Sequence, residues 1–210
     1  MNAVRVVGLG PGDRGYILPA AVTAIEEADI LVGASRHLDA LRVYGKQTFA
    51  VEGRFAEMAA YIAGNARTHR IAVVVSGDTG FYSLLRYLKD NLPDMTYEII
   101  PGLSAMSLMF ARLGLMHDDA FTGSVHGKAL DVAALVKEHK KVGLLTDGKT
   151  APAVIAMKLL EQGIQNKSMA IGERLSYADE KISILSLEQA ADYAADALSI
   201  VVIYDEDVHI

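Results

Sequence analysis

Apolar positions along the chain alternate between two spacings, and this alternation predicts short strands followed by helices. The strongest predicted strand is the aliphatic run Ile71–Val75, which ends at the polar turn Ser76-Gly77-Asp78. Apolar residues at positions 55, 58, 59 and 62 have the spacing of one helix face. The first half is predicted to contain strands 4–8, 30–33, 48–51, 71–75 and 97–100, and helices 18–28, 35–43, 55–62, 82–90 and 106–113.

The second half repeats the alternation after residues 114–119, which show no clear period. We therefore expect two domains, 1–116 and 117–210. The second is predicted to contain strands 120–125, 141–146, 168–172, 181–185 and 198–204, and helices 131–139, 151–162 and 187–195. Ser186 and Gln189 form a capping-box pattern at the start of the last helix. The fold class is α/β, with a mainly parallel first sheet and a mixed second sheet, because no helix separates the strands around residues 168–185.

Composition narrows the classes of protein that fit this pattern. The 210 residues are 51% hydrophobic and 22% charged, which argues against disorder. No apolar run reaches the length of about 18 residues that a membrane helix needs, and the N-terminus lacks a signal-type pattern. We expect a cytoplasmic protein with no membrane partner. The net charge of −6 argues against a nucleic-acid partner.

Cysteine and histidine usage excludes further chemistry. The chain has no cysteine, so it has no disulfide, no catalytic thiolate and no cysteine-based metal site. Its histidines show no paired ligand spacing, and no protein metal site is expected.

Glycine-rich loops follow three of the predicted strands. We call residues 8–15 the first loop, 76–83 the second loop and 101–105 the third loop. If their strands are parallel, the loops gather at the sheet edge where open α/β sheets bind ligands. Glycines in the second and third loops allow a ligand to approach the backbone closely, and Ser104 begins a helix whose free N–H groups favour a carboxylate. Phe81, Tyr82 and Leu103 could wall an aromatic base.

Two common nucleotide-binding motifs do not explain these loops. Gly10, Gly12 and Gly15 formally satisfy G-x-G-x-x-G, but Pro11 interrupts the motif and the helix begins late. The second predicted strand ends at Gly33 without the acid that would bind a ribose. This argues against a Rossmann dinucleotide site and against the common Rossmann-type methyltransferase. The chain contains no P-loop motif.

The ordered loops resemble a known family. VVGLGPGDRGYILPAA, SGDTGFYSLL and IIPGLSAMSLMFARLGL are similar to the tetrapyrrole methylases, over a region from Val4 to about Tyr204. Segments 33–36, 124–128 and 145–148 resemble the branch that methylates carbon 5 of a late precorrin, with or without cobalt, in cobalamin biosynthesis. The alternatives are another member of the family (a different corrin C-methyltransferase, or one acting on diphthine or ribosomal RNA) and a non-catalytic tetrapyrrole carrier.

The resemblance implies two α/β domains with S-adenosylmethionine held in the cleft between them, largely by backbone groups. The residues that it assigns to the cofactor are Leu9, Gly77, Asp78, Thr79, Phe81, Ser104, Ala105, Leu145, Thr146, Gly172 and Glu173. One departure concerns the second loop, where the family usually has G-D-P and this chain has Thr79. The loop then lacks the fixed φ of proline, and we expect it to be less rigid.

The implied acceptor is a reduced tetrapyrrole with several carboxylates, for which the sequence offers cationic residues in its motif loops. The expected substrate-binding residues are Pro11, Arg14, Arg36, Lys128 and Arg174. His126 is the candidate catalytic residue, either taking a proton from the macrocycle or donating a hydrogen bond to a carboxylate. Any cobalt belongs to the substrate. The resemblance also implies a homodimer and, at this chain length, a decarboxylating C15-methyltransferase on a separate polypeptide.

Overall fold

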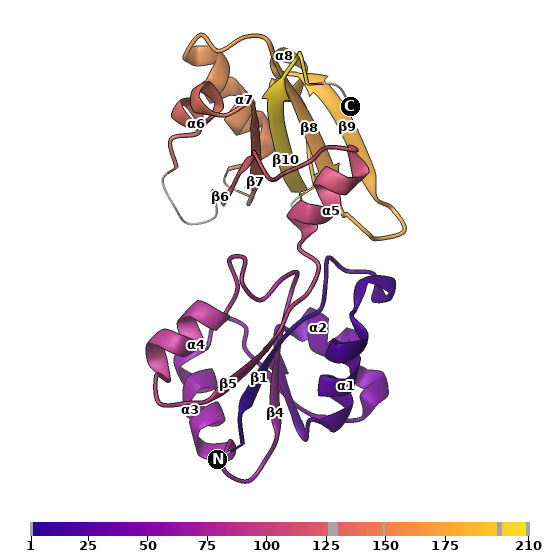
Figure 1. Ribbon diagram of the computed structural model, residues 1–210, viewed down its shortest axis with the longest axis vertical. Coiled ribbons are helices and arrows are strands. Elements are labelled where there is room, and N and C mark those ends of the chain that lie inside the picture. The colour runs from indigo at the N-terminus through magenta and orange to yellow at the C-terminus, as the bar shows by residue number, and fades with distance from the viewer. Residues whose placement is uncertain (1, 126–129, 149, 197–198, 209–210) are drawn as a thin grey trace. The chain divides into compact units, whose positions relative to one another are not determined.

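The structure is a computed structural model that describes residues 2–125, 130–148, 150–196 and 199–208. The chain divides into two compact units, Met1–Ser104 and Ala105–Ile210, which we call the first and second units (Figure 1). The predicted boundary after residue 116 therefore lies inside the second unit. The helix before that boundary, α5 (Ala105–Arg112), contacts strands of the second sheet.

The first unit is built on a five-stranded sheet with the order β3-β2-β4-β1-β5. Every strand pairing in it is parallel, as the sequence predicts. Its strands are β1 (Val4–Gly8), β2 (Ile30–Gly33), β3 (Gln47–Ala50), β4 (Ile71–Val75) and β5 (Tyr97–Ile100). Its helices are α1 (Pro19–Glu27), α2 (Ser35–Ala40), α3 (Phe55–Asn65) and α4 (Leu85–Asn91).

Helices cover both faces of this sheet, because neighbouring residues of each buried strand point to opposite faces. Val6 and Val73 pack with Met58 of α3 on one face. Val7 and its neighbours pack with Ile25 of α1 on the other. Figure 1 shows α3 and α4 on one side of the strands and α1 and α2 on the other. A sheet buried on both faces explains why β1 and β4 are continuous apolar runs rather than alternating ones.

The second unit contains a mixed sheet with the order β6-β7-β10-β8-β9. Strands β6 and β7 are parallel, and the remaining pairs are antiparallel. Its strands are β6 (Phe121–Ser124), β7 (Lys141–Leu145), β8 (Lys167–Glu173), β9 (Lys181–Ser186) and β10 (Ser199–Asp205). Besides α5, its helices are α6 (Val132–Glu138), α7 (Pro152–Glu161) and α8 (Leu187–Ala191).

Glycines in the second sheet let α5 lie close against it. A Cβ placed on Gly143 of β7 would lie 2.5 Å from the Met106 Sδ, and one on Gly172 of β8 would lie 2.5 Å from the Met109 Sδ. Both methionines belong to the predicted apolar stripe of this helix and are buried. The stripe therefore packs on the second sheet, which is why the unit boundary falls before α5.

Three predicted helices are shorter in the structure by three residues or more. The helix expected over 35–43 ends at Ala40. The helix expected from residue 82 begins at Leu85, because Tyr82 has a φ of 52° and cannot continue a right-handed helix. The helix expected to reach residue 195 ends at Ala191. The capping box of Ser186 and Gln189 at its start is present as predicted. In the part of the chain that the structure describes, no helix has the length and apolar character needed to cross a membrane.

Candidate functional site

The first, second and third loops meet at the carboxyl edge of the first sheet. They follow β1, β4 and β5, and β1 lies between the other two strands. A Cβ placed on Gly102 would lie 2.2 Å from the Gly77 carbonyl oxygen and 2.8 Å from the Gly8 carbonyl carbon. Only a residue without a side chain fits there. The structure thus brings together three bends that are far apart in the sequence.

The first and second loops are also joined by a pair of backbone hydrogen bonds. The Gly77 N–H donates to the Gly10 carbonyl at 2.8 Å, and the Gly10 N–H donates to the Gly77 carbonyl at 3.2 Å. Both glycines have positive φ, 79° and 64°, a conformation that other L-residues rarely adopt. Gly10, the first glycine of the formal G-x-G-x-x-G pattern, therefore forms a bridge between two loops rather than the turn of a Rossmann motif.

Asp78 links the second loop to the third. Its Oδ1 accepts the Gly80 N–H at 2.7 Å and its Oδ2 accepts the Gly102 N–H at 3.2 Å. The sequence assigned Asp78 to the cofactor, but in the structure both of its carboxylate oxygens bind backbone N–H groups of the protein. Asp78 therefore contributes to this edge by holding the two loops in register.

Hydrogen bonds also stabilise the turn that follows Asp78. Thr79 is buried, and its carbonyl accepts the Ser83 hydroxyl. The Ser83 Oγ in turn accepts the Leu85 N–H at 3.2 Å, at the start of α4. Thr79 lacks the ring of the family's usual proline, but these bonds supply a constraint that sequence could not reveal.

The remaining cofactor candidates of the first unit differ in burial. Leu9 is 7% exposed, and its side chain packs with Ile25 in the core beneath the edge. Only its backbone is left to face a ligand; its N–H donates to the Val75 carbonyl at 2.9 Å. Phe81 and Ser104 are half-buried, as is Ala105, the first residue of the second unit.

The expected substrate-binding residues of the first unit follow β1 and β2 at the same edge. Pro11 is half-buried within the first loop. Arg14 is exposed, and its Nη2 donates to the Ala40 carbonyl at the end of α2, at 2.8 Å. Arg36 is also exposed, and its Nε donates to the His37 Nε2 at 3.2 Å. Both arginines keep part of their guanidinium groups accessible at this edge.

His37 has the most strongly perturbed pKa among the histidines that the structure describes. Burial disfavours its charged form and, together with the neighbouring Arg36 charge, lowers its pKa to about 4. The ring is therefore neutral at physiological pH, when its Nε2 can accept the hydrogen bond from Arg36. The sequence offered no signal for this shift, because it arises from tertiary packing.

Cofactor candidates of the second unit lie side by side across its sheet. Leu145 of β7 and Gly172 of β8 are both in register with Ile200 of β10. Thr146 follows β7 and Glu173 ends β8, so these residues share one edge of the second sheet. The order of the strands places two distant sequence segments together.

Their polar side chains nevertheless bind other protein groups. The Thr146 Oγ1 donates to the Ser199 carbonyl at 2.7 Å. Buried Glu173 accepts the Tyr193 hydroxyl at 2.5 Å and the Asp196 N–H at 2.8 Å. As with Asp78, these side chains bind groups of the protein itself.

The other predicted residues of the second unit fall into two groups. Arg174, at a φ of 47°, forms an ion pair with Asp179 at 2.6 Å, which raises the pKa of the guanidinium, and lies over the Tyr177 ring. His126 and Lys128 lie outside the described residues. Among the residues that the structure describes, no group of three or more histidine, aspartate and glutamate side chains could hold a metal ion.

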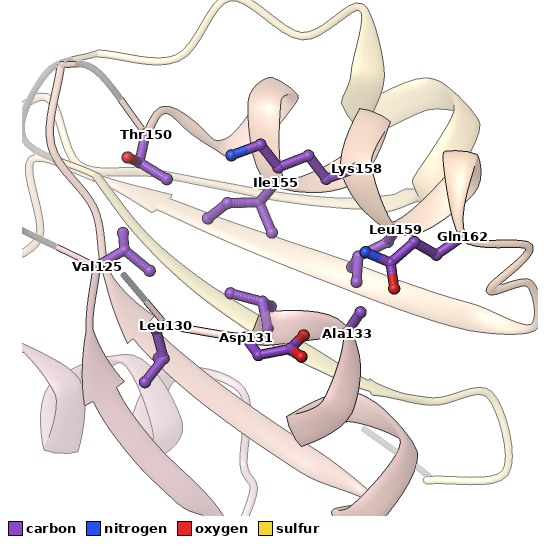
Figure 2. Close-up of a pocket in the computed structure, with 10 residues that line it drawn as sticks. Val125, Leu130, Asp131, Ala133, Thr150, Ile155, Lys158, Leu159 and Gln162 are labelled. Atoms are coloured by element: carbon purple, nitrogen blue, oxygen red, sulfur yellow. The ribbon is translucent and has the colours of Figure 1, made fainter. Parts of the chain in front are cut away.

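The second unit also contains a pocket of about 230 Å³ beside α6 and α7. Val125, Ile155 and Leu159 supply apolar walls, and Figure 2 shows Lys158 and Asp131 on opposite sides of it. The Asp131 carboxylate already caps α6 by accepting the Ala134 N–H at 3.1 Å. Of the predicted site residues that the structure describes, none lines this pocket.

A comparison with known families agrees with the arrangement of the loops. Residues 3–191 match the family described as Tetrapyrrole (Corrin/Porphyrin) Methylases. The chain belongs to this family. Membership accounts for the ordered glycine loops and for the two α/β units.

Individual relatives cover almost the whole chain. A Salmonella typhimurium protein named cobalt-precorrin-7 C(5)-methyltransferase is 35% identical over 97% of this chain and 99% of its own length. A Methanocaldococcus jannaschii protein, named a probable enzyme of the same kind, is 30% identical over 99% of this chain and 100% of its own.

Solved structures share the fold at lower identity. A cobalt precorrin-4 methyltransferase has a TM-score of 0.81 at 16% identity, with 96% of this chain and 94% of that one covered. A uroporphyrin-III C-methyl transferase from Thermus thermophilus, solved with S-adenosylhomocysteine, has a TM-score of 0.79 at 20% identity, with 97% of each chain covered.

Proposed function

We propose that this tetrapyrrole methylase transfers a methyl group from S-adenosylmethionine to carbon 5 of precorrin-7, or of its cobalt complex, in cobalamin biosynthesis. The observation that carries the proposal is the 35% identity, over 97% of the chain, to a relative named for that reaction. The meeting of Gly8, Gly77 and Gly102 supports it, because it brings the three loops together at one edge of the first sheet.

The edge formed by the three loops fits a cofactor that is held by backbone groups. Gly10 and Gly77 face each other without side chains, and the Asp78 and Ser83 bonds fix the loop beside them. We propose that backbone atoms of Leu9, Gly77, Thr79, Phe81, Ser104 and Ala105 hold S-adenosylmethionine, together with Leu145, Thr146, Gly172 and Glu173 of the second unit. The cofactor supplies a methyl group on a positively charged sulfur, which is already a good leaving group.

The main contribution of the chain is then to orient the two reactants. Correct alignment of a donor and an acceptor is worth roughly 7–11 kcal/mol of the barrier. The acceptor carbon is made nucleophilic by the macrocycle, so the chain needs no covalent nucleophile, in keeping with its lack of cysteine. We propose that His126 takes the proton released by the macrocycle, or donates a hydrogen bond to a carboxylate.

Cationic side chains complete the proposed substrate site. Arg14 and Arg36, both at the carboxyl edge of the first sheet, are placed to bind carboxylates of the tetrapyrrole. Lys128 and Arg174 are proposed to do the same from the second unit, with Pro11 contacting the ring. Arg174 already pairs with Asp179, so a substrate carboxylate would have to share or replace that partner.

Three further statements belong to the same proposal. The enzyme acts in the cytoplasm and forms a homodimer. The decarboxylating C15-methylation is carried by a separate polypeptide. For the last point, a Sinorhizobium relative named precorrin-6Y C(5,15)-methyltransferase [decarboxylating] is 27% identical, and this chain spans only 44% of its length.

Mass spectrometry of the reaction products tests the proposed function. The chain is incubated with S-adenosylmethionine and either precorrin-7 or cobalt-precorrin-7, and carbon 5 is identified by NMR of a labelled methyl group. A gain of one methyl at carbon 5 of either compound is expected, and the preferred compound identifies the pathway. The proposed acceptor is wrong if neither compound gains a methyl group while another corrin precursor, a diphthine intermediate or ribosomal RNA is methylated.

A further inference from the structure

An aromatic side chain projects into solvent at the edge where the three loops meet. Tyr82 of the second loop is 52% exposed. Its φ of 52° lies in the left-handed region, which is strained for a non-glycine residue. An exposed ring also gains less from burial than a ring in the core does.

Neighbouring residues hold the Tyr82 ring in place. The half-buried Phe81 ring contacts it edge to face, with 4.9 Å between centroids and an interplanar angle of 88°. Before it, the Gly80 N–H is bound to Asp78 at 2.7 Å. After it, Ser83 bonds to the Thr79 carbonyl and accepts the Leu85 N–H. Hydrogen bonds thus constrain the backbone on both sides of Tyr82, and the Phe81 ring contacts its ring, which lowers the entropic cost of binding to it.

We infer that the Tyr82 ring is a stacking surface that binds the flat tetrapyrrole. This inference rests on the proposed function. Aromatic rings stack on extended conjugated systems in offset geometry, and such contacts add to the affinity that the burial of area supplies.

The difference in burial along the second loop indicates that the Tyr82 ring binds the tetrapyrrole rather than the adenine base of the cofactor. Thr79, two residues after the Gly10–Gly77 bridge, is only 3% exposed, whereas Tyr82 lies at the outer end of the loop. The buried part of the loop suits a cofactor that is bound by glycine backbone. The larger macrocycle has the area to cover an exposed ring.

Two variants of Tyr82 separate the ring from the backbone. Tyr82→Asn removes the ring and keeps a residue that tolerates the left-handed conformation. Tyr82→Phe keeps the ring without its hydroxyl. We expect Tyr82→Asn to raise the KM and the dissociation constant of cobalt-precorrin-7 or precorrin-7 about tenfold. The kcat and the affinity for S-adenosylmethionine, measured by calorimetry, stay within twofold, and Tyr82→Phe resembles the wild type.

Val43→Asn is the matched control. Val43 is an apolar residue that is 73% exposed, in the turn that precedes β3 at the opposite edge of the sheet. An unchanged tetrapyrrole affinity in Tyr82→Asn overturns the inference, as does an equal loss in Tyr82→Phe or in Val43→Asn. A loss of affinity for S-adenosylmethionine alone would assign the ring to the cofactor site, and it would also overturn the inference.

The outcome can be separated from that of the proposed function. If the wild type binds the tetrapyrrole without methylating carbon 5, the proposed reaction is wrong, and the dissociation constants of the Tyr82 variants still decide the role of the ring. If the wild type binds neither precorrin-7 nor its cobalt complex, both proposals fall.

Discussion

At the scale of single residues, several side chains that the family resemblance assigns to ligands bind other groups of the protein itself. Asp78 bonds to Gly80 and Gly102, and Glu173 bonds to Tyr193 and Asp196. A sequence motif shows that a carboxylate is present, but not which N–H group reaches it first. In both cases the carboxylate fixes the edge of a sheet, and its effect on a ligand is exerted through the loops.

Removal of the Asp78 carboxylate tests this reading. Asp78→Ala leaves the Gly80 and Gly102 N–H groups without their acceptor, which should lower the free energy of unfolding by about 1–3 kcal/mol. The affinity for S-adenosylmethionine should fall by about tenfold or more, because the second and third loops lose their connection. Urea unfolding and calorimetric titration measure the two effects.

Ser186→Ala is the control for Asp78→Ala. It removes the cap of α8, where the Ser186 Oγ accepts the Gln189 N–H, and should cost about 1 kcal/mol without changing cofactor affinity. Normal binding of S-adenosylmethionine by Asp78→Ala would count against the placement of the cofactor at these loops.

The pKa of His37 predicts a pH dependence of stability. Its pKa is about 4 in the folded chain against an ordinary value of 6.5, so the unfolded chain binds the proton more tightly. The stability contributed by the neutral ring is complete above pH 6.5 and is lost as the pH falls toward 4. Between pH 7 and pH 4 the loss should be on the order of 3 kcal/mol.

His37→Gln isolates this contribution from the carboxylates that titrate in the same range. Unfolding free energies of wild type and variant are measured in urea across this pH range. The wild type should lose more stability than the variant on acidification, so the difference between them narrows. If the unfolding free energies of wild type and variant change in parallel with pH, the His37 ring is already protonated, or accessible to solvent, in the folded chain.

At the scale of elements, the contact between α5 and the second sheet depends on two glycines. A Cβ at Gly143 or Gly172 would collide with Met106 or Met109. Gly143→Ala and Gly172→Ala should each lower the free energy of unfolding by about 1–3 kcal/mol. Gly64→Ala, in α3 where an added Cβ meets nothing within 4 Å, should instead stabilise by about 0.5–1 kcal/mol.

Combining Gly143→Ala with Met106→Ala gives a further check. If the steric explanation is correct, the double variant is more stable than the sum of the two single effects predicts. Strict additivity of the two changes would show that the Met106 side chain already moves aside in Gly143→Ala.

The elements themselves were largely predictable, because apolar spacing reports burial directly. The buried runs of β1 and β4 and the helical stripes of α3 and α5 appear where the sequence predicts them. Element ends were less predictable. The expected helix through residue 195 stops at Ala191 because Glu173 binds Tyr193 and the Asp196 N–H, and no local pattern announces such tertiary bonds.

The boundary between the units was also difficult to predict from local sequence patterns. The segment 114–119 lacks periodicity, yet the division falls between Ser104 and Ala105. The apolar stripe of α5 would suit either sheet, and only Gly143 and Gly172 on the second sheet give it a matching surface. The meeting of the three loops could be predicted, because parallel strands bring their carboxyl ends to one edge.

At the scale of the whole molecule, the net charge of −6 bears on the choice of acceptor. An acidic chain repels the phosphate backbone of RNA. A small tetrapyrrole needs only a few local cations, and Arg14 and Arg36 at one sheet edge can supply them. We expect the Arg14→Gln, Arg36→Gln double variant to raise the KM for cobalt-precorrin-7 or precorrin-7 by about tenfold and to leave the affinity for S-adenosylmethionine unchanged.

Steady-state kinetics at low and high salt measure this effect. The wild-type KM should rise with salt, and that of the double variant should rise less. An Arg42→Gln variant is the control, because Arg42 is exposed and pairs with Asp39 outside the three loops. An equal change in KM in the control would show that overall charge, and not these two side chains, attracts the substrate.

The central claim is that the first, second and third loops together form the site of the methyl donor. A crystal structure of the chain with S-adenosylhomocysteine tests it most directly. The account predicts the ligand at the carboxyl edge of the β4-β1-β5 strands, in contact with backbone of all three loops and clear of the Asp78 carboxylate. A ligand bound elsewhere, for instance in the pocket between Lys158 and Asp131, would contradict it.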